Sequence, residues 1–356
     1  MLTLRSTRRL VAASATAGLV LALAGVASPA SAAASNTGLF GASDPTYDGA
    51  YRQSMALLGL KAAGTALPAS AVAWLSGQQC ASGAFEAYRA DTAVPCADPN
   101  PETFTGPDSN STALAALALK AAGRPAAAQR AVTVLRSVQN ADGGWGYTLG
   151  AASDVNSTAL VLAALQAFPT TLQADGPIPR GTAYLKKAQL PCTAAPASRG
   201  ALPYQPGQAA NALASTQGLL GWSGSLPVSP AKTATSLART TCSSPAATRL
   251  AWSVNRLLVT SKGRIPSAMD AKQIDWNATA TGVLALAAAH TGRAGQSVAI
   301  AALGRNAAAY TGTGAAANPA ATGTLIQAAV ATGKNPRSFG SAKTNLVSLL
   351  LGTLQK

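Results

Sequence analysis

The most informative segment of this chain is Gln139-Asn-Ala-Asp-Gly-Gly-Trp-Gly-Tyr147, which is followed by Asp154-Val-Asn-Ser-Thr-Ala-Leu160. A weaker copy of its first part lies upstream, where Phe85 follows Gln79 by the same number of residues as Trp145 follows Gln139. Loops that recur along a chain are the signature of a repeat protein. The first hypothesis is therefore a fold assembled from structural repeats.

The copies extend into the helical runs before each loop. Lys61-Ala-Ala-Gly64 and Lys120-Ala-Ala-Gly123 end two apolar runs at an offset of 59 residues. A first, less regular unit opens near Tyr47, and each later unit opens with an asparagine. Six units are therefore predicted, and the starts of the five regular ones are Asn110, Asn156, Asn211, Asn277 and Asn318.

Each unit is predicted to hold two kinds of helix. The first helix is apolar almost all round, as in residues 111–119 and 158–165, and such a helix must be buried on every side. The second helix has one apolar stripe, as in residues 131–138, which is typical of a helix that covers a core. The alternation predicts an all-α fold, an α/α toroid of six helical hairpins with inner and outer helix rings.

The loop at residues 139–145 resembles the glutamine-tryptophan repeat of squalene-hopene cyclases. Residues 45–356 as a whole resemble the prenyltransferase and squalene oxidase repeat superfamily, whose members are α/α toroids. We expect the loops to be structural, because glycine permits tight turns and large aromatic side chains such as Trp145 and Phe85 bury apolar area at the ends of outer helices.

The first 32 residues are expected to be a cleaved signal peptide. Three arginines precede an apolar run at residues 10–26, and the Ala-Ser-Ala at residues 30–32 is a small-residue cleavage site. General export and the twin-arginine route both remain open. Residues 33–46 are expected to be a linker and residues 47–356 the toroid. We expect the mature protein to be secreted, soluble and monomeric, with no membrane span.

The chain is strongly basic, with a formal net charge of +15, of which the three arginines of the expected signal contribute part. Such an excess favours anionic surroundings, including cell-wall polymers, phospholipid head groups and phosphate-bearing ligands. A solvated basic surface without a partner is the simpler alternative. Nucleic acid is excluded as a partner, because the basic residues are scattered and no helix-turn-helix or zinc-finger spacing is present.

Four cysteines in an exported chain predict two disulfides. Of the three possible pairings we favour Cys80 with Cys96, which would tie the long loop of the first unit, and Cys192 with Cys242, although the sequence does not decide between them. No zinc site and no cofactor are expected, because Cys-x-x-Cys is absent and His290 is the single histidine.

The inner helices of a toroid run parallel, so their N-termini open on one mouth. Asp and Asn side chains there are expected to cap free backbone N–H groups. Six converging helix ends would also favour an anionic or amide-rich ligand. The candidate ligand-binding residues of this rim are Tyr47, Asp48, Asp108, Asn110, Asp154, Asn156, Tyr204, Asn211, Asp275, Trp276 and Asn277, with Gln208 and Asn318 expected at the same level.

Class II terpene cyclases protonate an alkene with an Asp-x-Asp-Asp-Thr-Ala motif, in which the middle Asp is the donor. Asp154-Val-Asn-Ser-Thr-Ala159 and Asp108-Ser-Asn-Ser-Thr-Ala113 resemble that motif, with Asn at the donor position. An amide cannot donate the proton, and a chain that is 5% aromatic offers few rings to stabilise carbocations. No catalytic residue is assigned, and olefin cyclisation is not expected.

Binding without catalysis is the favoured function. The N-terminal domain of transcobalamin and intrinsic factor is similar in architecture, a toroid that helps to hold a corrinoid at its mouth. We therefore expect a secreted, non-catalytic toroid that binds a small amphipathic ligand, a corrinoid first, or a cell-envelope partner. The alternative is an enzyme of the terpene cyclase or prenyltransferase superfamily, or a carbohydrate-active toroid that uses rim carboxylates.

Overall fold

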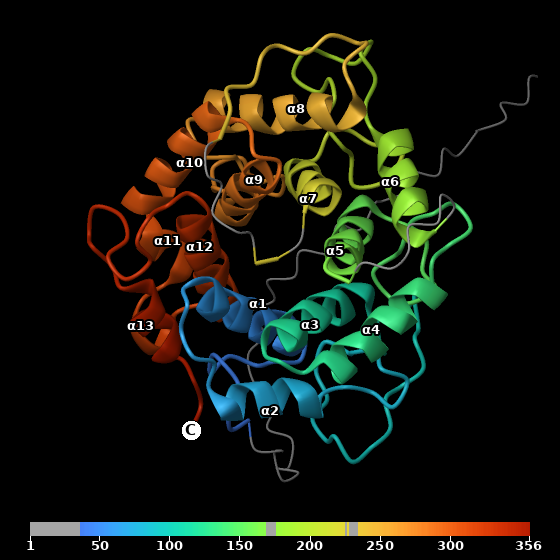
Figure 1. The fold of residues 1–356 in the computed structure, drawn as a ribbon, viewed down its shortest axis with the longest axis vertical. Coiled ribbons are helices and arrows are strands. Elements are labelled where there is room, and N and C mark those ends of the chain that lie inside the picture. The colour runs from blue at the N-terminus through green and yellow to red at the C-terminus, as the bar shows by residue number, and fades with distance from the viewer. Residues whose placement is uncertain (1–35, 169–175, 225, 228–233) are drawn as a thin grey trace, which may run out of the picture. The chain divides into compact units, whose positions relative to one another are not determined.

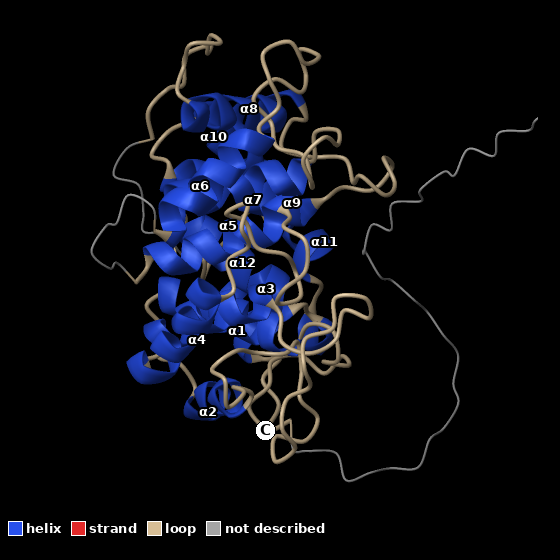
Figure 2. Ribbon diagram, turned by 90° about the vertical axis from the view of Figure 1, so that its right-hand side faces the viewer, coloured by secondary structure: helices blue, strands red, loops and turns tan. Residues whose placement is uncertain are grey.

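Two kinds of helix alternate along the chain, as the two hydrophobic patterns predict. The structure, a computed structural model, describes residues 36–168, 176–224, 226–227 and 234–356. Within these ranges the regular elements are helices, and the extended backbone forms only isolated bridges (Figure 2). The expected signal peptide, residues 1–32, lies outside the described residues.

The inner ring consists of six helices that are buried on nearly every face. Each packs against the next along the chain, and the last returns to the first, which closes the ring (Figure 1). They are α1 (Gly49–Ala62), α3 (Ser109–Ala121), α5 (Val155–Gln166), α7 (Ala212–Ser223), α9 (Trp276–Ala288) and α12 (Pro319–Ala331).

The outer ring covers the inner one with amphipathic helices. In α4, for example, Ala131, Val132 and Leu135 are buried, whereas Arg130 and Thr133 are exposed. The outer helices are α2 (Ala69–Gly77), α4 (Pro125–Ser137), α6 (Pro177–Ala188), α8 (Ala246–Thr260), α10 (Arg293–Arg305) and α13 (Leu346–Leu351), and the short α11 (Ala307–Thr311) and η1 (Gly314–Ala316) lead from α10 to α12. The α/α toroid of six hairpins is confirmed.

The repeated loop is a structural joint, as predicted. The Trp145 ring is buried, and its indole Nε1 donates a hydrogen bond to the Leu135 carbonyl at 2.7 Å. Its backbone N–H donates to Oγ1 of Thr158, on the following inner helix, at 2.9 Å. One aromatic residue therefore joins the end of α4 to the start of α5.

The glutamine that opens each loop makes a second joint. Nε2 of Gln139 donates to the Gly143 carbonyl in its own loop at 2.7 Å and to the Pro177 carbonyl at the start of α6 at 2.9 Å. Gln79 and Gln189 repeat this pair of bonds toward α4 and α8. The amide thus holds each loop against the next outer helix, which explains why this residue type recurs.

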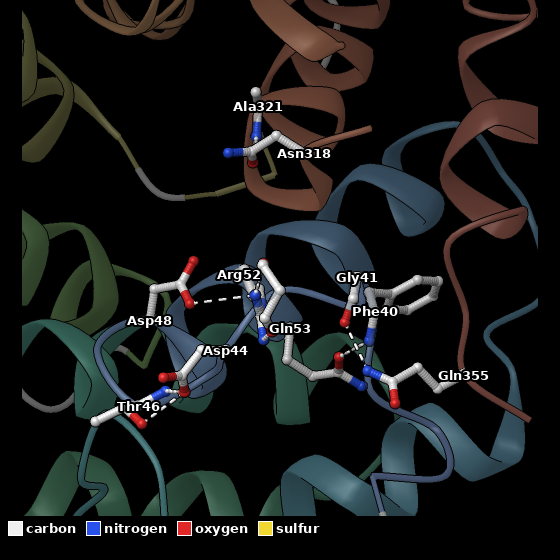
Figure 3. Close-up of polar contacts among 11 residues, drawn as sticks. Phe40, Gly41, Asp44, Thr46, Asp48, Arg52, Gln53, Asn318, Ala321 and Gln355 are labelled. Atoms are coloured by element: carbon white, nitrogen blue, oxygen red, sulfur yellow. Dashed lines mark hydrogen bonds and ion pairs between the residues drawn. The ribbon is translucent and has the colours of Figure 1, made fainter. Parts of the chain in front are cut away.

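The two ends of the toroid together build the last loop. The N–H of Gly41 donates to the Thr353 carbonyl at 2.8 Å, and Nε2 of Gln355 donates to the Gly41 carbonyl at 2.6 Å (Figure 3). Phe40 is fully buried, and its N–H donates to Oε1 of Gln53 at 2.8 Å, as the N–H of Trp145 does to Thr158. Residues 36–41 were expected to belong to a linker, but they complete the sixth repeat and fasten the ring.

Both favoured disulfide pairings are confirmed. Cys80 is bonded to Cys96 within the long loop of the first unit, and Cys192 is bonded to Cys242 across the third and fourth units. No helix in the described part of the chain is long and apolar enough to cross a bilayer.

Glycine lets neighbouring inner helices touch at their backbones. A Cβ added at Gly323 of α12 would lie 2.2 Å from the Met55 carbonyl oxygen of α1, and one added at Gly59 would lie 2.7 Å from the Cα of Gly323. No side chain fits between these helices, so the seam where α12 meets α1 requires glycine.

Replacement of Gly323 by alanine is expected to weaken that seam. Overpacking against a rigid backbone should lower the free energy of unfolding by about 1–3 kcal/mol. The matched control is Gly77→Ala at the end of α2, where an added Cβ meets nothing within 4 Å and alanine favours the helix. Chemical denaturation measures both changes, and equal stabilities for the two variants would contradict the close-packing argument.

Candidate functional site

The starts of the inner helices share one capping arrangement. Oδ1 of Asp108 accepts a hydrogen bond from the Ser111 N–H at 2.7 Å, and Oδ1 of Asp154 accepts from the Ser157 N–H at 2.7 Å. Asn211, Asp275 and Asn318 cap α7, α9 and α12 in the same way. Each of these five side chains caps the start of its own helix, as the sequence predicted for Asp and Asn at the rim.

The first inner helix departs from this pattern. Asp48 precedes α1 but makes no capping hydrogen bond. Its Oδ1 lies 3.4 Å from Nη1 of Arg52, and the same guanidinium donates from Nη2 to the Ser43 carbonyl at 2.7 Å (Figure 3). Burial raises the pKa of Asp48, and Arg52 opposes that rise.

Three asparagines that were expected to be caps do not cap their helices. Asn110, Asn156 and Asn277 are second residues of α3, α5 and α9, and the caps lie two residues earlier. A cap accepts from the N–H three residues ahead, and the aspartates already occupy that position. The prediction that these three residues cap their helices was therefore wrong. Their amides are left available for other contacts. Gln208 is also not at a helix start, because α7 begins four residues later.

Two of these amides cross to neighbouring elements. Nδ2 of Asn156 donates to Oε1 of Gln217 on α7 at 2.5 Å, and Oδ1 of Asn277 accepts from the hydroxyl of Tyr310 on α11 at 3.1 Å. The amide carbonyl oxygens of Asn110 and Asn156 are buried and have no hydrogen-bond partner within the described part of the chain. Buried acceptors are rarely left unpaired, so these two oxygens are unusual within the rim.

Apolar side chains lie one turn further into the ring. Leu114 and Leu160 follow Asn110 and Asn156 by four residues, which places them on the same helix faces as the amides. Both leucines are buried. Leu114 and Leu160 therefore belong to the packed aliphatic interior of the ring, one turn beyond the two amides.

The predicted aromatic rim residues differ in exposure. Tyr47 is 74% exposed, Tyr204 is 38% exposed, and Trp276 is half-buried as the first residue of α9. The Tyr204 carbonyl accepts a hydrogen bond from the Val155 N–H at 3.0 Å, so the third loop rests on the start of α5. Burial, and then the nearby Asp154 carboxylate, raise the pKa of the Tyr204 phenol to about 12.

Asp108 is the carboxyl of the rim with unusual chemistry. It is 2% exposed, and its Oδ2 has no hydrogen-bond partner among the described residues. Burial raises its pKa to about 6, and the hydrogen bonds from Ser111 only partly offset this. Burial also raises the pKa of Asp154, but there the Ser157 hydroxyl donates to Oδ2 at 2.8 Å. Asp108 therefore changes charge at mildly acidic pH.

One group of side chains has the spacing of metal ligands. In the described ranges, Cys80, Glu86 and Cys96 form the single group with metal-like spacing, and the disulfide consumes both thiols. His290 follows α9 at the end remote from the rim, as predicted, and is exposed. Its ring makes no hydrogen bond within the described part of the chain.

The pKa of Asp108 predicts a pH dependence of stability. Its folded-state pKa lies above the unfolded value of ~3.9, so the stability gained by holding the proton is complete below pH ~4 and is lost as pH rises through about 6. Asp108→Asn keeps a capping oxygen and removes the ionisation. Relative to wild type, the free energy of unfolding of Asp108→Asn should rise by roughly 2 kcal/mol between pH 4 and pH 8.

Urea denaturation across that pH range tests this expectation. Asp270→Asn is the control, because Asp270 is exposed. The assignment fails if the two variants follow the same pH profile.

Known proteins resemble this chain in part of its sequence and in its fold. No protein-family model matches the chain. A drimenyl diphosphate synthase from Streptomyces showdoensis is 40% identical over 80 residues, which cover 22% of this chain and 15% of the synthase. The matched part is thus a small fraction of that relative.

Two solved structures share the fold. A type II terpene cyclase from Scytonema, determined with geranylgeranyl dihydroxybenzoate, has a TM-score of 0.52 at 13% identity, over 83% of this chain and 91% of that one. The ent-copalyl diphosphate synthase from Streptomyces platensis also has a TM-score of 0.52, at 16% identity, over 80% of this chain and 50% of that one. The chain is an α/α toroid with a terpene cyclase-like fold.

Proposed function

We propose that this protein is a terpene cyclase-like toroid that binds a small isoprenoid-type amphiphile at its mouth without protonating it. The observation that carries the proposal is the amide of Asn156, together with that of Asn110, at the position where the cyclase motif has its acid. Each amide has a buried, unpaired acceptor oxygen, and a buried leucine lies one turn further along the same helix. A hydroxyl head group can donate to these oxygens while an apolar chain lies against Leu114 and Leu160.

The fold comparisons support the ligand class. They favour the terpene cyclase superfamily over a corrinoid carrier, because both solved structures are named for terpenoid chemistry. The Scytonema cyclase was solved with a molecule that joins a long apolar chain to a polar ring. Only the amide-rich rim still supports a corrinoid as the ligand. The binding test therefore includes a corrinoid as the competing ligand.

An enzymatic role is the second candidate, and the comparisons support it better than they support a non-catalytic binder. Asp108 is the one observation within the rim that favours it, because a carboxyl with a pKa of about 6 holds its proton at acidic pH. Alkene protonation requires a strong acid, however, and burial makes Asp108 a weaker one. The missing donor at Asn156 therefore argues for binding rather than cyclisation.

The proposed location is outside the cytoplasm. Two disulfides bond all four cysteines, which is typical of proteins that fold in an oxidising compartment. The expected signal peptide at residues 1–32 agrees with this location.

Binding at the mouth is tested with geranylgeraniol as the probe. The intrinsic tryptophan fluorescence, to which Trp276 at the start of α9 contributes, should change on saturation. Asn110→Ala with Asn156→Ala should weaken binding by about tenfold, because two hydrogen-bond acceptors are lost. Asn335→Ala, in an exposed loop beyond the far end of α12, is the matched control and should bind normally. Equal affinity for both variants, or tight binding of hydroxocobalamin with none of geranylgeraniol, would refute the proposal.

Catalysis is tested with geranylgeranyl diphosphate at pH 5 and pH 8, with products identified by mass spectrometry. We expect no cyclised product from wild type at either pH. A cyclised product that forms at pH 5 and disappears in Asp108→Asn would establish the enzymatic alternative instead.

A further inference from the structure

The basic residues of this chain are concentrated in its second half. Residues 176–356 contain 17 Lys and Arg and only two acids, Asp270 and Asp275. After Asp275 no Asp or Glu follows in the sequence. Surfaces built from this half have almost no carboxylates with which to neutralise their cations.

A cavity of about 830 Å³ lies in this half, within the size range of small-molecule sites. One wall is a stripe of α10 that runs from Arg293 through Ile300 to Arg305, and the other is the segment that follows α12, including Lys334 and Lys343. The cavity is thus lined by four cations and by no acidic side chain.

Three of the four cations are uncompensated. Within the described part of the chain, the side chains of Arg305, Lys334 and Lys343 make no hydrogen bond and no ion pair. Arg293 uses one of its five donors, from Nε to the Ala234 carbonyl at 2.9 Å. Like charges gathered around one cavity repel each other, so this arrangement favours an anion between them.

A second basic cavity, of about 280 Å³, shows the contrast. Three of its four arginines serve the fold, and Arg239 is the exception. Arg249 donates to the Ser244 carbonyl at 2.7 Å, Arg199 donates to the Ala194 carbonyl at 2.9 Å, and Arg256 donates to the carbonyls of Pro196 and Ala197. These three guanidiniums are bound to the backbone, whereas three of the four cations of the larger cavity are free within the described part of the chain.

The walls of the larger cavity are fixed to each other. The Ser341 N–H donates to the Gly304 carbonyl at 3.3 Å, and a Cβ added at Gly340 would lie 2.0 Å from the same oxygen, so the segment lies directly on α10. Phe339 is buried beneath it. The line of contact therefore presents cations from both sides together with the hydroxyls of Ser297, Ser338 and Ser341.

We propose that this cavity is a binding site for a phosphate-bearing ligand. Phosphate oxygens accept several charge-assisted hydrogen bonds at once, which matches three free cations and a set of hydroxyl donors. The site lies outside the ring and is separate from the mouth. Its ligand is recognised by phosphate groups, whether these belong to a soluble polyphosphate or to a lipid head group.

The test compares two triple variants of equal charge change by calorimetric titration with tripolyphosphate. Arg305→Ala, Lys334→Ala and Lys343→Ala together should weaken binding by at least about tenfold. Lys186→Ala, Lys187→Ala and Lys272→Ala remove three exposed cations outside the cavity and should leave affinity within about twofold of wild type. All six residues are exposed, and melting curves verify that both variants fold.

A second arm separates the two sources of phosphate. Vesicles of phosphatidylcholine with and without phosphatidylglycerol are tested by co-sedimentation with the same proteins. Loss of tripolyphosphate or vesicle binding in the cavity variant alone supports the proposal and identifies the source. Equal loss in both triple variants, or no binding of wild type to either probe, would overturn it.

Discussion

Closure of the inner ring is the constraint on which the rest of this structure depends. Six helices that are apolar on nearly every face cannot be exposed to water, and neither an isolated hairpin nor an open stack would cover the first and last of them. The seam between α1 and α12 therefore has to be as tight as the others. Glycine at positions 59 and 323 lets the two backbones meet, and residues 36–41 join the C-terminal strand-like segment to complete the last loop.

This closure also determines where chemistry can occur. Because the six inner helices run parallel, their N-termini lie at one rim. The aspartate and asparagine caps there accept hydrogen bonds from backbone N–H groups. The second residue of each helix is then the first side chain free to face a ligand. In α3 and α5 that residue is an asparagine, and the proposed function has it accept a hydrogen bond where a cyclase would donate a proton.

The mouth and the outer wall have different electrostatic characters. The rim carries amides together with the carboxyls of Asp48, Asp108, Asp154 and Asp275, whose pKa values are all raised by burial. The wall around α10 carries cations that no carboxylate neutralises. The two proposed sites therefore suit different ligands.

The repeat pattern of the sequence was sufficient to predict the architecture. The recurring loops that open at Gln79 and Gln139 predicted repeats. Runs that are apolar all round predicted the inner helices, and runs with one apolar stripe predicted the outer helices, because the periodicity of apolar residues shows which helix faces are buried. Four cysteines predicted two disulfides, but only the distance between chain segments selected the pairing. The acid motif with asparagine at the donor position was also readable, because a missing carboxyl is a property of composition.

Tertiary structure decided what depends on contacts between distant segments. Asn110, Asn156 and Asn277 looked like caps from their position before apolar runs, yet the caps are the aspartates two residues earlier, since capping is a matter of hydrogen-bond geometry. Residues 36–41 showed no loop motif, because half of their loop lies more than 300 residues away at Gln355. The cationic cavity was equally invisible along the chain, since Arg305 and Lys343 become neighbours only when α10 and the segment after α12 pack together.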